Sequence, residues 1–337
     1  MIKKILLVLF FAALSNVSAQ SSTARFLYWS TSAETAALGG AGSAIPGNSF
    51  SAFLNPAGLA FQKAFTVGSS FYQPFSPFDF NAQFLLTVSH ADDSFGALGM
   101  TMGGYWSQAQ LRTGNGGYEY GVLQDNPSIL EPTNFQYKLS YAKKIKKHLS
   151  AGMSFSVLGV RLANKPTESE QGNGETVAAL ADFGILFTNF LPNSTYSKSG
   201  GEGNNFKGFS FGLSILNLGP DIFYIDEVQA DPPPSLILLG ISYSPFYSEN
   251  INSRVLIDFE KRLYDSDDLD FIHTGGEVTI YDIISLRLGY QLNNINNDSF
   301  FTYGAGIRYR ALSFNIARFK KYILTSWQFD VQISSEL

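Results

Sequence analysis

Three histidines, His90, His148 and His273, are the side chains best suited to acid–base or metal chemistry in this sequence. They lie far apart along the chain, and neither a His-x-x-His nor a His-Glu pair is present. Cysteine is absent, which excludes thiolate ligands, disulfides and a lipid-modified cysteine. Because zinc sites gather several such ligands, we expect no metal site and interpret the histidines as solvated or lumen-facing side chains.

Other polar clusters also give weak support for chemistry. A Ser-His-Asp triad needs its members to meet in space, so a hydrolase would place a serine or aspartate beside one histidine. We expect no such pair and therefore no enzyme. The acidic run 265–270 could bind calcium but lacks the EF-hand spacing, and the glycine run 114–117 does not join a strand to a helix. Both are predicted to be solvated loops, and no cofactor is expected.

The composition is that of a transmembrane β-barrel. Of the 337 residues, 15% are charged and 15% aromatic, with 31 glycines, and no stretch of 18 apolar residues follows the N-terminus. Low charge with many aromatic and glycine residues, and without a helical span, is typical of strands that cross a membrane. The net charge of −5 and the absence of basic clusters give no support for nucleic-acid binding.

Residues 1–19 have the pattern of a secretory signal peptide. Lys3 and Lys4 precede an apolar stretch over 5–14, and small residues occupy the cleavage site at 17–19. That stretch is too short to span a bilayer. The chain is therefore expected to be exported, and to act in the periplasm, outside the cell or in an outer membrane.

Alternating segments fill the chain from about residue 63 to 337. Side chains on a strand point alternately to opposite faces, and in residues 208–215 and 284–292 one face is apolar while the other is small or polar. About fourteen such segments are predicted, in an antiparallel barrel. The apolar parity switches near Val157 and Leu158, which predicts a β-bulge there. The segments centre on Gly68, Phe84, Leu98, Leu139, Phe155, Phe183, Phe211, Leu238, Ile257, Gly276, Leu288, Ala305, Phe314 and Phe329.

Connections and charges agree with a barrel in lipid. Short connections, such as 91–93 and 310–311, alternate with longer ones at 108–132 and 164–174, and only 191–205 breaks this rule. A soluble β-sandwich would also alternate. However, the charged residues fall on the polar parity, and a charge facing lipid would cost about 2–4 kcal/mol. Four of them are predicted to face the lumen, as filling ion pairs rather than a polar path: Asp258, Glu260, Arg287 and Arg308.

Residues 20–62 differ from the rest and are predicted to form a hatch inside the barrel. The stretch 36–60 is uncharged and rich in glycine, alanine and serine. Its glycines permit close packing and positive φ, residues 49–54 could form a short capped helix, and Pro56 would end that helix. A disordered linker is the alternative, but the apolar side chains of this stretch argue against it. The proposed hatch motif is Gly39, Gly40, Gly42, Asn55, Pro56, Ala57 and Gly58.

These motifs resemble those of a known family. The N-terminal stretch is similar to the hatch of the PorV/PorQ family, which is related to the FadL-type fatty-acid channels. Three further pieces resemble that family in the same order, although the chain ends on Leu337 where outer-membrane barrels usually end on an aromatic residue. These pieces are Tyr137-Lys138-Leu139-Ser140-Tyr141-Ala142 with the basic residues after it, Gly212 to Pro220, and His273 to Glu277 with Leu286 to Tyr290.

The resemblance implies a fourteen-stranded, non-enzymatic barrel of the cell outer membrane. The leader and the composition rich in Phe, Tyr and Asn suit a source among the Bacteroidota. It implies a role in the type IX secretion system: binding exported proteins by their C-terminal signal domain and passing them to a surface attachment machine. Its expected partners are outer-membrane lipid, exported cargo proteins and other subunits of the secretion system. The alternative is a FadL-like channel for hydrophobic small molecules, for which the apolar run 222–225 is a candidate lining.

Overall fold

The computed structural model describes residues 22–335, apart from 63–64, 77–81, 107–109, 113–127, 131–132, 162–174, 189–207, 224–229, 247, 249, 265–270, 294–298 and 322–323. The predicted signal peptide, the glycine run 114–117, the acidic run 265–270 and the connection 191–205 therefore lie outside the described residues.

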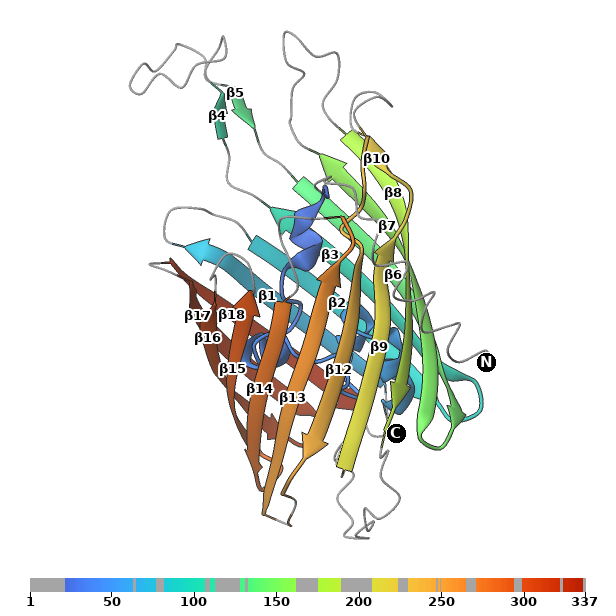
Figure 1. Cartoon of the computed structure of the whole chain (residues 1–337), viewed down its shortest axis with the longest axis vertical. Coiled ribbons are helices and arrows are strands. Elements are labelled where there is room, and N and C mark those ends of the chain that lie inside the picture. Colours follow the sequence, from blue (N-terminus) through green and yellow to red (C-terminus); the bar gives the residue numbers. More distant parts are fainter. Residues whose placement is uncertain are drawn as a thin grey trace.

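Fourteen antiparallel strands close into one barrel, which confirms the predicted fold class and strand number (Figure 1). Each strand pairs with its neighbours along the chain, and β1 pairs with both β2 and β18. All fourteen predicted centres lie within these strands. The strands are β1 (Phe65–Ser76), β2 (Ala82–Asp92), β3 (Gly96–Trp106), β6 (Thr133–Lys146), β7 (Leu149–Arg161), β8 (Glu175–Phe187), β9 (Gly208–Leu218), β12 (Leu236–Ser244), β13 (Ile251–Arg262), β14 (Phe271–Ile280), β15 (Ile284–Asn293), β16 (Phe300–Tyr309), β17 (Leu312–Lys321) and β18 (Leu324–Ser335).

Alternation of side chains explains why these segments form a barrel with an apolar outside. In β15, Leu286 and Leu288 point outward, and Leu288 is 69% exposed. Arg287 and Gly289, between and after them, are buried inside. An outward leucine is favourable in the hydrocarbon of the membrane. Polar side chains at inward positions, in contrast, need hydrogen-bond partners inside the barrel.

The two ends of the barrel differ. The connections 93–95, 147–148, 281–283 and 310–311 are short and lie at one end, called here the tight-turn end. The opposite, long-connection end carries two small hairpins, of which the first stands above the wall and the second packs against β8. One pairs β4 (Gln110–Arg112) with β5 (Ser128–Leu130), and the other pairs β10 (Ile222–Phe223) with β11 (Ala230–Asp231).

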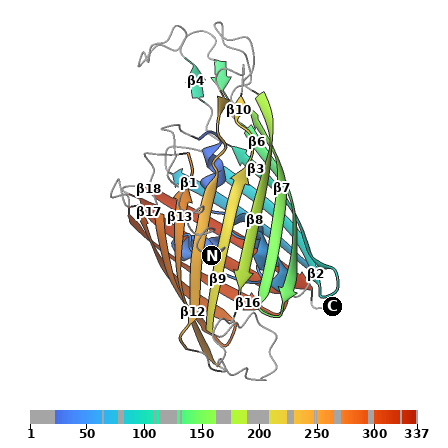
Figure 2. The ribbon, with the colours of Figure 1, turned by 45° about the vertical axis from the view of Figure 1, so that its right-hand side comes forward.

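The N-terminal segment, residues 22–62, runs through the inside of the barrel (Figure 2). It contains η1 (Arg25–Tyr28), α2 (Ala33–Ala37), η2 (Ser51–Phe53) and η3 (Pro56–Phe61). The predicted helix over 49–54 is wrong in its form, because only Ser51–Phe53 is helical and Pro56 begins η3 instead of ending η2. The Asn55 side chain caps η3 by accepting from the amide of Ala57, and proline suits a first turn, where its missing N–H is not needed. No helix among the described residues is long and apolar enough to cross a bilayer.

The bulge predicted at Val157 and Leu158 is wrong. Pairing of β7 with β6 and with β8 continues through both residues without a shift. Leu158 and Val160 keep the inward parity of Ser154 and Ser156, and they pack with Leu180, Ile222 and Phe26. The apolar pattern changes because, toward the long-connection end, the lumen contains apolar side chains of the N-terminal segment.

The inward direction of the Leu158 side chain can be tested by mutation. Leu158→Ala should lower the free energy of unfolding by about 2–5 kcal/mol, the usual cost of removing a buried leucine side chain. Leu139→Ala is the matched control, since Leu139 is 59% exposed on the lipid side, where acyl chains can fill the space. Urea unfolding of the barrel in lipid vesicles measures both, and equal losses would contradict the inward position of Leu158.

Candidate functional site between the N-terminal segment and the barrel wall

Asp258 of β13 holds the middle of the N-terminal segment. Its carboxylate oxygen accepts hydrogen bonds from the backbone amides of Gly42 at 2.9 Å and Ser43 at 2.7 Å. The carboxylate is buried, and Gly240 beside it leaves the space that a side chain would fill. A charged acceptor with two amide donors forms stronger hydrogen bonds than a neutral one, so Asp258 is a firm attachment point.

Asp330 of β18 binds the start of α2. Its Oδ2 atom accepts from the amide of Ala33 at 2.7 Å, and its Oδ1 atom accepts from the Asn315 side chain at 2.7 Å. Ser32 caps the same turn by accepting from the amide of Thr35. The first amides of a helix have no acceptor within the helix, and the Asp330 carboxylate supplies that acceptor at the start of α2.

A chain of ion pairs links α2 to three wall strands, and a hydrogen bond extends it to a fourth. The guanidinium of Arg254 lies 2.9 Å from Glu34 of α2 and 2.8 Å from Glu277 of β14. Arg287 of β15 bonds Glu277 at 2.6 Å and the amide oxygen of Asn315 at 2.8 Å. Since each charge faces an opposite charge or an amide, the cluster avoids the cost of an unpaired charge inside the barrel.

His273 of β14 joins the segment to a second charged group. Its Nδ1 atom donates to the carbonyl oxygen of Gly39 at 2.7 Å, because that oxygen can only accept. Its Nε2 atom lies 3.1 Å from Glu260, which also accepts from Arg262 at 2.8 Å. The Arg262 guanidinium stacks on Tyr28 of η1 and on Phe271 of the wall, with 3.9 and 4.2 Å to the ring centroids. This cluster therefore connects the segment with β13 and β14.

The predicted motif residues of the segment make close contacts with the wall. Gly39 and Gly40 have φ of 73° and 94°, and a Cβ atom on Gly39 would lie 2.7 Å from the carbonyl oxygen of Thr274. Asn55 donates to the carbonyl oxygens of Ser43 at 2.9 Å and Ile185 at 3.0 Å. The carbonyl of Ala57 accepts from Ser150 at 2.8 Å, Gly58 packs on Ser51, and Pro56 touches the wall at Gly152 and Gly184.

Three of the four predicted lumen charges lie in this interface. Asp258 and Arg287 are buried in the contacts described above, and Glu260 is partly exposed there. Arg308 has the inward parity, but it lies at the tight-turn end of β16 with its side chain exposed. Glu34 and Arg254 were not singled out from the sequence, and Asp330 was assigned to the polar parity of its strand without a role in the lumen. The inward parity of Arg254 and Asp330 was a usable signal, whereas nothing indicated that Glu34 would meet Arg254.

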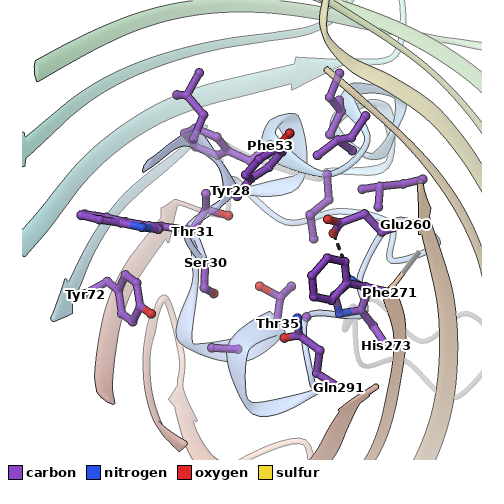
Figure 3. A pocket seen from close by; sticks show the side chains of 18 of the residues that line it. Tyr28, Ser30, Thr31, Thr35, Phe53, Tyr72, Glu260, Phe271, His273 and Gln291 are labelled. Atoms are coloured by element: carbon purple, nitrogen blue, oxygen red, sulfur yellow. Dashed lines mark hydrogen bonds and ion pairs between the residues drawn. The ribbon is translucent and has the colours of Figure 1, made fainter. Parts of the chain in front are cut away.

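A cavity of about 540 Å³ lies between the segment and the wall, in the half nearer the long-connection end (Figure 3). Eight of the side chains that line it are aromatic, and Arg25, Lys138, Glu260, Arg262 and His273 line it as well. Lys138 pairs with the buried Asp182 at 2.7 Å. The volume falls within the range of small-molecule sites, and the walls combine apolar rings with a few polar groups. The aromatic residues are Tyr28, Trp29, Phe53, Tyr72, Tyr105, Phe271, Phe300 and Phe319.

The histidines form no recognisable catalytic group. His90 is exposed near the tight-turn end of β2, His148 lies in the β6–β7 turn, and His273 has the partners given above. Residues 208–212 have the Gly-x-Ser-x-Gly spacing of a hydrolase elbow, but they lie inside β9 rather than at a strand-to-helix turn. The described part of the chain contains no group of three or more His, Cys, Asp or Glu suited to a metal ion.

Comparisons with known proteins agree with this architecture. A family model described as "Type IX secretion system protein PorV" matches residues 13–267, which is most of the chain. No curated protein sequence matched the chain.

Similar solved structures include the toluene transporter TodX of Pseudomonas putida, with 12% identity, coverage of 90% of this chain and 96% of TodX, and a TM-score of 0.52. The CymD monoaromatic hydrocarbon channel has 12% identity, coverage of 90% and 97%, and a TM-score of 0.56. A FadL homologue of Pseudomonas aeruginosa has 10% identity, coverage of 90% and 98%, and a TM-score of 0.50. At such identities the similarity concerns the fold.

The attachment at Asp258 can be tested directly. Asp258→Ala leaves two buried amides without an acceptor, and each such donor costs about 1–3 kcal/mol. The thermal unfolding temperature should fall, and protease should cut residues 22–62 faster than in the unaltered barrel. Asp258→Asn keeps one acceptor oxygen and should give a smaller effect.

The matched control is Arg308→Ala, which removes an inward-parity charge that does not contact the segment in the described hydrogen bonds and ion pairs. If Asp258→Ala and Arg308→Ala behaved alike, Asp258 would not hold the segment.

Proposed function

The chain belongs to the PorV family of type IX secretion system proteins, and from that premise we propose that it binds exported proteins and passes them to the cell-surface attachment machinery. The observation that carries this proposal is the family match, which covers the N-terminal segment and most of the barrel. The protein is an outer-membrane β-barrel of that system, and we propose that it acts without catalysis. Residues 1–19 would be removed on export.

The filled interior supports binding over conduction. Carboxylates, ion pairs and glycine contacts attach residues 22–62 to the wall at many points, so the interior is largely occupied. A protein partner would then meet the barrel at its long-connection end. We propose that the connections 108–132, 164–174 and 219–234 carry these contacts. Among the described residues there, Phe223 of β10 has an exposed fraction of 47%, which offers an apolar contact outside the wall.

A pull-down tests cargo binding. The C-terminal signal domain of an exported protein, fixed to a resin, should retain the detergent-solubilised barrel. Replacing residues 113–127 by a flexible linker should reduce retention about tenfold or more, since a few residues usually carry most of the binding energy. The matched control replaces the tight turn 281–283 at the opposite end. Equal retention of both variants would remove the connection 108–132 from the proposal, and no retention of the unaltered barrel would contradict cargo binding.

A second candidate is a channel for hydrophobic small molecules, and the aromatic-lined cavity favours it. The titles of the similar structures name a toluene transporter and monoaromatic hydrocarbon channels, although the likeness in itself concerns only the fold. Such a channel would need a path from the cavity past the N-terminal segment. Loss of uptake of an aromatic hydrocarbon on deletion of the gene would favour this candidate over cargo transfer.

We further propose that residues 20–62 are a hatch and residues 63–337 the barrel. Deleting 38–59 removes the amides bonded to Asp258 and the glycine contacts near Thr274. The barrel should still fold, because its strand pairing does not involve the segment, and leakage of small solutes from vesicles should rise. If the deletion prevents membrane insertion, the segment is a folding element and not a gate.

A further inference from the structure

The β6–β7 turn carries the most basic stretch of the chain. Four lysines, Lys143, Lys144, Lys146 and Lys147, surround Ile145 within five residues, although the whole protein has a net charge of −5. The four lysines are exposed, and Ile145 is 62% exposed. The cargo proposal does not use this turn, which lies at the end opposite to the long connections.

The turn continues the lipid-facing surface of its strand. Leu139, Tyr141 and Lys143 share the outward parity of β6. The register of β6 with β7 shifts between Lys144 and Lys146, so the exposed Ile145 lies at an irregularity just past the end of this stripe. Tyrosine is enriched where a membrane meets water. A lysine just past it can lay its stem on apolar atoms and place its ammonium at the headgroup level.

Lys144 has a separate, structural role. Its ammonium lies 3.1 Å from Asp93 of the neighbouring turn and 5.7 Å from the ring centroid of Phe61, the last residue of η3. Asp92 and Asp93 are the acidic residues of that neighbouring turn, and Asp92 is bonded to Ser94 and Phe95. Asp93 therefore offsets the charge of Lys144, whereas neither Lys143 nor Lys146 has a carboxylate partner among the ion pairs of the described residues.

From this geometry we propose that the β6–β7 turn binds the phosphate-bearing headgroup of an anionic phospholipid in the leaflet at the tight-turn end. Lys143 and Lys146 supply the cations, and Ile145 enters the boundary with the acyl chains. An exposed apolar side chain among lysines, just past the lipid-facing stripe, fits a membrane surface better than the acidic face of a soluble protein. The proposal does not rest on cargo binding.

Native mass spectrometry of the full mature barrel tests the proposal. The barrel is released from nanodiscs of phosphatidylcholine alone or of phosphatidylcholine mixed with phosphatidylglycerol, and its retained lipids are identified. The unaltered protein should retain phosphatidylglycerol in preference. The double variant Lys143→Gln with Lys146→Gln should reduce that preference about tenfold or more, since each lysine near an anionic surface contributes about fivefold. Lys144 is left unchanged, because its pairing with Asp93 supports the fold.

The matched control is Arg308→Gln with Arg310→Gln, which removes two exposed charges at the same end, one from the end of β16 and one from the turn after it. It should retain phosphatidylglycerol like the unaltered protein, and the heat-dependent gel shift of the barrel should show that both variants fold. Ile145→Ser should weaken retention of phosphatidylglycerol while leaving the charges in place. Equal retention of both lipids by the unaltered protein, or equal loss in the two double variants, would overturn the proposal.

Discussion

The structure depends on one constraint: polar groups that face the inside of a closed barrel must find partners there. The wall strands satisfy their own backbone, but their inward carboxylates need donors, and the N-terminal segment brings amides that need acceptors. Asp258 and Asp330 meet both needs at once, since each accepts from backbone amides of the segment while buried in the wall. The segment and the wall are therefore complementary in charge, and neither half is satisfied alone.

Shape follows the same logic as charge. Short carboxylate–amide distances require the two backbones to approach closely, and glycines on both sides permit this. Gly39 of the segment lies against Gly289 of the wall, where a Cβ atom would come within 2.1 Å of the Gly39 nitrogen. Small residues inside the barrel thus allow the segment to pack closely against the wall, which an empty water channel would not require. The lumen resembles a packed core in its middle and opens into a cavity only toward the long-connection end.

The two ends of the barrel consequently present different surfaces. Toward the long connections, the aromatic cavity and the added hairpins offer surfaces for partners or ligands from outside. Toward the tight turns, η3 packs against β6, β7 and β8, and four exposed lysines lie at the end of β6. An occupied interior, with the longer connections gathered at one end, is consistent with membership of a secretion-system family.

The sequence predicted the number of strands and the direction of most side chains, because the alternation of side chains in a barrel strand depends only on neighbours along the chain. Asp258, Glu260 and Arg287 were found by parity for that reason. The family resemblance also followed from the sequence. Tertiary structure alone decided which inward charges meet. Glu34 and Arg254 are 220 residues apart, and their pairing depends on where the segment lies inside the closed wall. The inward position of Leu158 was missed likewise, because apolar partners from the segment reversed the usual polarity of a lumen position.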